Sequence, residues 1–263
     1  MSAASNLIIS HGDYTGLAAD YARYRPGYAL SVATAILSLL ARPLSEIDAA
    51  DVGAGTGIWT IMLAARGLRS VTAVEPNDEM RREGILATRG IDISWRKGSG
   101  EATGLPTESV DLVSMASSFH WVDFEKGCAE FQRILRPGGR FAALWNPRLV
   151  EASPLFMEIE SEITRLKPDF RRAYSGRVGL TERLTEMLWS KDDFDDILYI
   201  EGRHIARQTP EQYLGVWRSV NDIQVQLGPN LFGQFLRYVE RKVEGLPSIE
   251  TTYLTRAWTA RRA

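Results

Sequence analysis

The residues best suited to do chemistry gather around a glycine-rich turn at positions 51–57, DVGAGTG. The turn follows a short apolar run and opens a helix-like segment, and its glycines allow a tight bend and a close backbone approach to a ligand. Glu75 ends the next apolar run, 22 residues after Gly53. A carboxylate there can accept hydrogen bonds from both hydroxyls of a ribose. The turn and the acid together predict a nucleoside cofactor.

The glycine spacing disfavours a nicotinamide dinucleotide. That ligand's fingerprint is G-x-G-x-x-G, whereas the third glycine here, Gly57, comes one residue early and Ile58 fills the expected place. Asp51 and Glu75 also bracket the turn with negative charge, which disfavours a pyrophosphate. A nicotinamide oxidoreductase is therefore a disfavoured alternative.

Composition sets the class of protein and its partners. The 263 residues are 44% apolar and 24% charged, enough for one sizeable core with an appended lobe. The formal charge of −2 and the scattered basic pairs predict no nucleic-acid partner. We see no secretion signal, and the longest weakly polar stretch, 29–41, is shorter than the ~20 residues that span a bilayer. We therefore expect a cytoplasmic protein without a membrane partner, as a monomer or homodimer.

Cysteine and histidine are too sparse for disulfide or metal chemistry. The single cysteine, Cys128, can form neither an internal disulfide nor a multi-thiolate zinc site, which fits a reducing compartment. His120 and Asp123 lie three positions apart without further ligands in register. No metal site is expected.

Apolar runs alternate with helix-length segments from Ile47 to about Trp145, the pattern of successive βαβ units. Two later runs, Ile197–His204 and Thr251–Trp258, alternate apolar and polar residues, as at an antiparallel edge. We expect an α/β fold: a doubly wound, Rossmann-like sheet of seven mostly parallel strands with an antiparallel edge strand and a helical cap. The first five strands are expected at 47–51, 70–74, 91–95, 110–115 and 140–145.

Helical patterns in the second half predict the cap. One helix begins at Ser153-Pro154, a second at Thr209-Pro210 with Gln212 completing a capping box, and a third follows Asn230. The second is expected to carry one apolar stripe of Tyr213, Val216, Trp217, Val220 and Ile223. We expect one domain in three parts: an arm and helix over the cofactor at 1–42, the cofactor-binding core at 43–149, and cap insertions with the last two strands at 150–263.

Taken together, these motifs resemble the class I methyltransferases that depend on S-adenosylmethionine, in the branch with the type 11 small-molecule methyltransferase domain. The resemblance spans roughly residues 13–146. Residues 51–57 match motif I, Glu75 in VEPN matches the ribose-binding acid, and 98–102, GSGEA, match the adenine loop. Residues 21–28, YARYRPGY, are similar to the N-terminal Y-x-x-x-R-P-x-Y element. Residues 110–113, 119–121 and 135–139 look like the fourth strand, its active-site exit and the turn into strand five.

The resemblance implies a cofactor site for S-adenosylmethionine, which leaves as S-adenosylhomocysteine. Glycine-turn residues would line its methionine part, Glu75 its ribose and Gly100 with Glu101 its adenine, while Arg25 would pair with the methionine carboxylate. Two residues depart from the family: Ser99 stands where many relatives have an aspartate, and Ser117 replaces a common glutamine. The full set of expected cofactor residues is Tyr21, Arg25, Gly53, Ala54, Gly55, Gly57, Glu75, Pro76, Gly100, Glu101 and Ala116.

Methyl transfer from a sulfonium is an in-line displacement, so the enzyme must mainly align the acceptor and exclude water. A carboxylate acceptor is already nucleophilic, but a hydroxyl or ammonium needs a base. His120 is the leading candidate for that catalytic base, because it follows the fourth strand and its ordinary pKa is near neutrality. The alternative is a structural histidine beneath the cap.

Aromatic residues on the arm, loops and cap are expected to contact the substrate, although aromatic stripes at helical spacing also serve core packing. The leading hypothesis is a methyltransferase acting on oxygen or nitrogen, with carbon as a further option, of a small metabolite. Two alternatives stay open: an RNA or protein acceptor, and a catalytically silent cofactor-binding module. The expected substrate residues are Tyr14, Tyr24, Trp121, Trp145, Tyr174 and Trp217.

Overall fold

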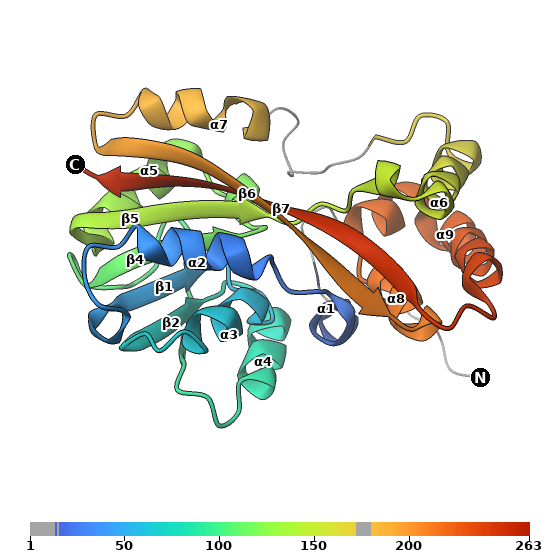
Figure 1. Ribbon diagram of the computed structural model, residues 1–263, viewed down its shortest axis with the longest axis horizontal. Coiled ribbons are helices and arrows are strands. Elements are labelled where there is room, and N and C mark those ends of the chain that lie inside the picture. Colours follow the sequence, from blue (N-terminus) through green and yellow to red (C-terminus); the bar gives the residue numbers. More distant parts are fainter. Residues whose placement is uncertain (1–13, 15, 172–179) are drawn as a thin grey trace.

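A seven-stranded sheet in the order β3-β2-β1-β4-β5-β7-β6 runs through the computed structural model (Figure 1). The structure describes residue 14, residues 16–171 and residues 180–263, so Tyr174 lies outside the described residues. All neighbouring strands pair in parallel except β7, which lies antiparallel between β5 and β6. The expected fold class is confirmed. The strands are β1 Asp48–Val52, β2 Ser70–Val74, β3 Ser94–Arg96, β4 Val110–Ala116, β5 Leu135–Trp145, β6 Phe194–Gln208 and β7 Ile249–Arg262.

Helices cover both faces of the sheet (Figure 1). Helices α5 and α7 pack on one face and share one apolar cluster with the strands. Helices α2 and α3 pack on the other face and share a second cluster. The described helices are α1 Ala18–Tyr24, α2 Leu30–Ser38, α3 Ile58–Ala64, α4 Asp78–Ala87, α5 Phe124–Ile134, α6 Pro154–Leu166, α7 Leu180–Trp189, α8 Pro210–Arg218 and α9 Asn221–Val243, with short 3₁₀ turns at Leu44–Glu46, Phe119–Trp121 and Val150–Ala152. None of them is long and apolar enough to cross a membrane.

The cap has a core of its own. Helices α6, α8 and α9 pack together beyond one end of the sheet, around Phe156, Trp217 and Phe235. Strands β6 and β7, of 15 and 14 residues, extend from the sheet to this lobe as a two-stranded ribbon, and Ile249 of β7 joins the cap cluster. Helix α1 contacts α8 on one side and α4 on the other. The arm therefore lies between the cap and the part of the molecule that contains α4.

Two sequence expectations about elements were wrong in detail. The apolar stripe predicted for one helix is divided, because α8 ends at Arg218 and Ile223 belongs to α9, although both Val220 and Ile223 are buried. Helix α9 is interrupted at Gly228, whose φ of 68° breaks the helix before Pro229. The strand expected at 91–95 is shorter and later, at Ser94–Arg96. The break at Gly228 explains the helix start predicted after Asn230, since proline cannot continue the hydrogen-bond ladder.

The capping box at the start of α8 is present as predicted. Thr209 Oγ1 accepts from the Gln212 backbone N–H at 3.2 Å, and Gln212 Oε1 accepts from the Thr209 N–H at 2.9 Å. Two amides at the start of the helix are thus satisfied by side chains.

Thr209→Ala should therefore lower the free energy of unfolding by about 1 kcal/mol, measured by urea denaturation. Ser161→Ala is the control, because Ser161 is an exposed helical serine that bonds only to the Glu158 carbonyl of its own helix. Its effect should stay within about 0.5 kcal/mol. Equal losses in the two variants would contradict a stabilising role for the capping box.

Candidate cofactor and acceptor site

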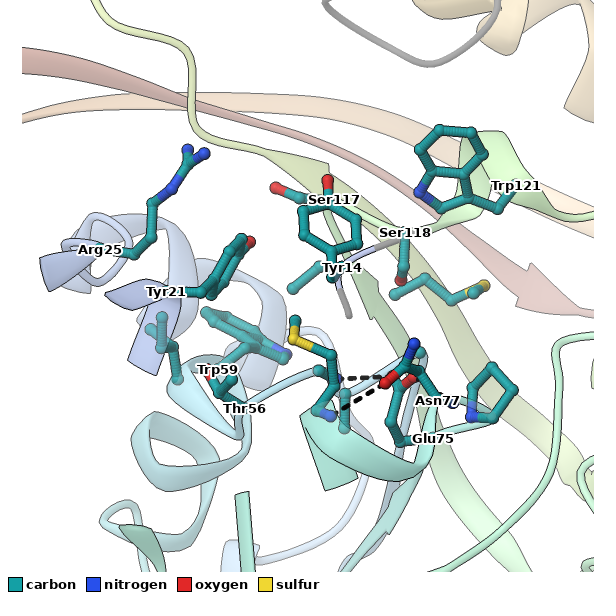
Figure 2. A pocket seen from close by; sticks show the side chains of 18 of the residues that line it. Tyr14, Tyr21, Arg25, Thr56, Trp59, Glu75, Asn77, Ser117, Ser118 and Trp121 are labelled. Carbon is teal, nitrogen blue, oxygen red and sulfur yellow. Dashed lines mark hydrogen bonds between the residues drawn. The ribbon is translucent and has the colours of Figure 1, made fainter. Parts of the chain in front are cut away.

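A cavity of about 370 Å³ lies beyond the carboxyl ends of β1, β2 and β4, where ligands of open α/β sheets bind. The arm closes it from one side and the glycine-rich turn forms its floor (Figure 2). Its lining comes from sequence segments far apart in the chain: Tyr14, Tyr21, Arg25, Pro26 and Tyr28 of the arm; Gly53, Ala54, Gly55, Thr56, Ile58 and Trp59; Glu75, Pro76, Asn77 and Met80; Ser99, Gly100 and Glu101; Met115, Ala116, Ser117, Ser118, Trp121 and Val122; and Asn146 and Tyr253.

The glycine turn needs its glycines for conformation and for space. Gly53, Gly55 and Gly57 have φ of 66°, 59° and 83°, a region that disfavours other residues. A Cβ on Gly53 would lie 2.6 Å from the Cβ of Ser118, so any side chain there would also displace the exit of β4. The turn therefore has one allowed shape, and it presents bare backbone to the cavity.

The amides at the start of the turn bond within the protein. Amides at the start of a helix commonly point toward a ligand, but Gly53 and Ala54 both donate to the Val74 carbonyl, at 2.8 and 3.1 Å. Gly55 N–H donates to Glu75 Oε2 at 2.8 Å. These amides hold the turn against the end of β2, which disfavours a pyrophosphate there, because that ligand gains most from outward-facing N–H groups.

Glu75 lies at the junction of two loops. It is 6% exposed, and its Oε1 accepts from the Asn77 N–H at 2.8 Å while Oε2 accepts from Gly55 (Figure 2). Burial raises the pKa of this carboxyl, and the two backbone hydrogen bonds oppose the rise. Each carboxylate oxygen can accept a second hydrogen bond. Glu75 is thus positioned to receive two hydroxyl donors on its cavity side.

Asp51, one strand away, is fully buried. Thr60 Oγ1 donates to its Oδ2 at 2.6 Å. Burial raises the pKa of Asp51 to about 7, and the charge of Glu75 adds to the rise. Asp51 anchors the start of the turn from below and does not line the cavity.

The arm is fixed over the cavity by polar contacts with the cap and the sheet. Arg25 Nε donates to Ser219 Oγ at 2.8 Å, Nη2 donates to the Ser219 carbonyl at 3.1 Å, and the guanidinium lies 4.9 Å from the centre of the Tyr21 ring. Asn146 Nδ2 donates to the Gly27 carbonyl at 2.9 Å, and its Oδ1 accepts from Thr255 Oγ1 at 2.7 Å. The end of β5 and the strand β7 thus hold the arm in place.

Ser117, at the exit of β4, has a strained backbone. Its φ is 56°, which is uncommon for a residue with a side chain and typical of functional sites. Its hydroxyl lies 3.0 Å from the Tyr28 hydroxyl, and the Tyr28 ring packs edge-on against Trp59 at 5.4 Å. The pair joins the arm to the sheet at the centre of the cavity.

The predicted adenine loop is closely packed. A Cβ on Gly100 would meet Val122 Cγ2 at 2.4 Å, so only glycine fits there. Glu101 Oε1 accepts from the Asp123 N–H at 2.9 Å, which joins this loop to the start of α5. Trp121 lies at the rim with 44% of its surface exposed. These residues form a narrow slot beside Glu75.

His120 lies outside the set of described residues that line the cavity. It is 8% exposed, and its Nδ1 accepts from Trp145 Nε1 at 3.1 Å. Burial lowers the pKa of His120 to about 4. A neutral ring whose Nδ1 accepts a hydrogen bond from an indole is typical of a structural histidine. This geometry therefore favours a structural role for His120 over the role of catalytic base.

The cavity includes most of the expected residues. The structure brings together all the expected cofactor residues except Gly57, and it adds Tyr14 and Trp121 from the expected substrate set. Three aromatics lie elsewhere. Tyr24 packs on Gly215, Trp145 lies in the sheet core, and Trp217 lies buried in the cap with the Arg148 guanidinium 3.8 Å from its ring centre. Trp145 and Trp217 serve core packing, whereas half-buried Tyr24 joins the arm to α8.

Several lining residues were missed at the sequence level. Tyr28 and Ser117 belong to motifs in the sequence but had no role assigned to them. Asn146 follows β5, and Tyr253 lies within β7. The alternation along β7 predicts which side of the sheet Tyr253 faces. It does not predict that the strand passes the arm, where Thr255 Oγ1 accepts from the Ala29 N–H at 2.8 Å.

The strand order and the position of the cavity are those of an open α/β sheet that binds its ligand at the carboxyl ends of the parallel strands. The model of the family described as "Methyltransferase domain" matches residues 50–143. An uncharacterized methyltransferase of Mycobacterium tuberculosis is 36% identical over 143 residues, 54% of each chain. The ubiquinone/menaquinone biosynthesis C-methyltransferase of Rubrivivax gelatinosus is 33% identical over 106 residues, 40% of this chain and 41% of that protein.

A structure from Anaeromyxobacter dehalogenans described as a type II methyltransferase has a TM-score of 0.66 at 22% identity, covering 90% of this chain and 98% of that one. This similarity supports the fold. The chain spans about half the length of the curated relatives it matches. The family match over residues 50–143 and the methyltransferase relatives agree with the resemblance to type 11 methyltransferases found in the sequence.

The buried state of His120 predicts a specific pH dependence of stability. Its folded pKa of about 4 lies below the ordinary 6.5, so the folded protein binds fewer protons between these values. The stabilisation by the neutral ring is complete above pH 6.5 and is lost as the pH falls toward 4. Relative to His120→Gln, the wild type should lose up to about 3 kcal/mol of unfolding free energy over this window.

Urea denaturation at several pH values measures that difference. Asp51 changes the unfolding free energy in the opposite sense over this pH range, because its folded pKa of about 7 is raised. Both proteins contain Asp51, so its contribution cancels in the difference. A wild-type-minus-variant difference that does not change with pH would contradict the buried, neutral state of His120.

Proposed function

We propose that this protein is an S-adenosylmethionine-dependent methyltransferase that transfers a methyl group to oxygen or nitrogen of a small metabolite. One observation carries the proposal: the buried Glu75 carboxylate, held by Gly55 and Asn77, faces the cavity beside the bare glycine turn. A nucleoside with a free ribose diol is the ligand that such a carboxylate recognises.

The cavity residues fit this cofactor at three places. Glu75 would hold the ribose, while Gly100, Glu101 and Val122 would enclose the adenine in the narrow slot beside it. Gly53 and Ala54 would lie under the methionine part, which would end at Tyr21, whereas Arg25 would face the acceptor and not the methionine carboxylate that the resemblance implied. The Thr56 hydroxyl is buried, lines the cavity and has no partner among the described residues, so it is available to a bound ligand.

When bound, the sulfonium supplies an electrophilic methyl group, and the carbon–sulfur electron pair stays on sulfur as the new bond forms. The protein's part is alignment and exclusion of water. The rings of Tyr14, Tyr21 and Tyr28 form the cover, and aromatic faces near a cation are favourable by about 0.5 to 2 kcal/mol. The Tyr28–Ser117 contact would fix the exit of β4 near the transferred group.

The alternatives differ in the acceptor or in turnover. The formal charge of −2 and the covered cavity disfavour an RNA or protein acceptor. The C-methyltransferase among the relatives keeps carbon open as the methylated atom. A silent binding module would bind S-adenosylhomocysteine without catalysing transfer. A cytoplasmic location and a monomeric or homodimeric state remain predictions from the sequence.

Glu75→Ala should weaken binding of S-adenosylhomocysteine by about 1 to 3 kcal/mol, because the ribose hydroxyls lose their acceptor. Isothermal titration calorimetry measures the dissociation constant, with NAD as a control ligand that should not bind. Glu83→Ala is the matched control variant, since Glu83 lies on α4 outside the cavity and pairs with Arg82. Unchanged affinity in Glu75→Ala would reject the cofactor site, and tight NAD binding would favour an oxidoreductase.

A further inference from the structure

Tyr253 brings a buried donor to the cavity from the last strand. It is 4% exposed and lines the cavity, and its hydroxyl has no hydrogen-bond partner among the described residues. Its ring stacks on His204 of β6 at 5.5 Å, and its backbone bridges to Arg148. A buried hydroxyl without a partner is unfavourable, and a rigidly held one in a cavity is a candidate ligand group.

Arg25 supplies a positive charge to the same cavity. The Nε–H group and one Nη2 hydrogen of Arg25 donate to Ser219. The remaining N–H groups of the guanidinium are available to a ligand. In the described part of the chain no carboxylate forms an ion pair with Arg25, whereas the nearby Arg148 pairs with Glu160 at 3.3 Å. Arg25 and Glu75 lie on opposite sides of the cavity in Figure 2. The cavity therefore has an acidic end and a basic end.

Tyr253 and Arg25 line the same cavity. Burial raises the pKa of the Tyr253 hydroxyl, and the charges of Arg148 and Arg25 oppose that rise. The hydroxyl stays protonated at neutral pH and acts as a donor. An oxygen anion between it and the guanidinium would receive hydrogen bonds from both.

We propose that Arg25 and Tyr253 bind a carboxylate of the methyl acceptor, which makes Tyr253 a specificity-determining residue. This inference rests on the proposed function. A planar guanidinium edge and one hydroxyl match the two oxygens of a carboxylate. A phosphate dianion would require more positive charge than this one arginine supplies.

The methionine part of the cofactor also carries a carboxylate, so the experiment must separate two sources. Calorimetry compares S-adenosylhomocysteine with 5′-methylthioadenosine, which lacks the amino-acid part, on wild type and Tyr253→Phe. We expect the substitution to leave both dissociation constants within about twofold. Selective weakening of S-adenosylhomocysteine would assign the hydroxyl to the cofactor and overturn the acceptor assignment.

Transfer is then measured with radiolabelled S-adenosylmethionine and a small-molecule cell extract, separated by ion exchange into anionic, neutral and cationic fractions. We expect label in products of the anionic fraction, and phosphatase treatment should leave that transfer unchanged. Tyr253→Phe should raise the half-saturating amount of this fraction on the order of tenfold, as expected for a lost hydrogen bond to a charged group.

Tyr213→Phe is the control, because Tyr213 is also a buried tyrosine, but it lies in the cap outside the cavity lining. It should leave half-saturation unchanged. Transfer only to neutral or cationic fractions, or to none, would overturn the proposal, as would loss of transfer after phosphatase or an equal effect of the two variants. Failure of the wild type to bind S-adenosylhomocysteine would instead count against the proposed function itself.

Discussion

The hydrogen bonds on the Glu75 carboxylate hold together the two loops that form the cavity. One oxygen accepts from the Gly55 amide in the first loop and the other from the Asn77 amide in the second. Without this carboxylate the turn would keep the bonds of Gly53 and Ala54 to the Val74 carbonyl but lose its link to the second loop, and the partly buried amides of Gly55 and Asn77 would lack this acceptor. The same residue that faces the ligand therefore also builds the floor on which the ligand would lie.

The cover of the cavity depends on a second set of contacts, made by elements outside the cofactor half. Asn146 holds the backbone of the arm at Gly27, and Ser219 of the cap holds Arg25. Because α1 lies between α4 and α8, small shifts of the cap would be transmitted to the arm. The packed cap core around Trp217 thus contributes to the site without touching it.

The sequence predicted the fold class, and the structure brings most of the expected cofactor residues to one cavity, because both features depend on local signals. The glycine turn, the acid at the end of the second strand and the capping box are each set by residues close together in the chain. The division between α8 and α9 was missed, because the apolar stripe continues across the break after Arg218. The alternation of apolar and polar residues along a strand predicts which face is buried. It does not predict which element packs against that face.

The acceptor side could not be predicted for the same physical reason. Tyr253 reaches the cavity only because a long ribbon brings β7 against the arm, which is a tertiary contact with no sequence signature. His120 had the expected position and a suitable ordinary pKa, yet burial and the indole of Trp145 gave it a different environment. Aromatic residues were similarly ambiguous, since Trp217 and Trp121 have the same chemistry and opposite exposure.

The β6–β7 ribbon separates two tasks within one chain. The proposed nucleoside contacts come from residues between 51 and 122, whereas β7 supplies a wall of the cavity and joins the cap as one continuous strand. Substitutions along the ribbon can thus alter what is methylated while leaving the glycine turn and Glu75 untouched. Descendants of such a protein can therefore change their substrate through substitutions in this two-stranded ribbon, without changes in the glycine turn or at Glu75.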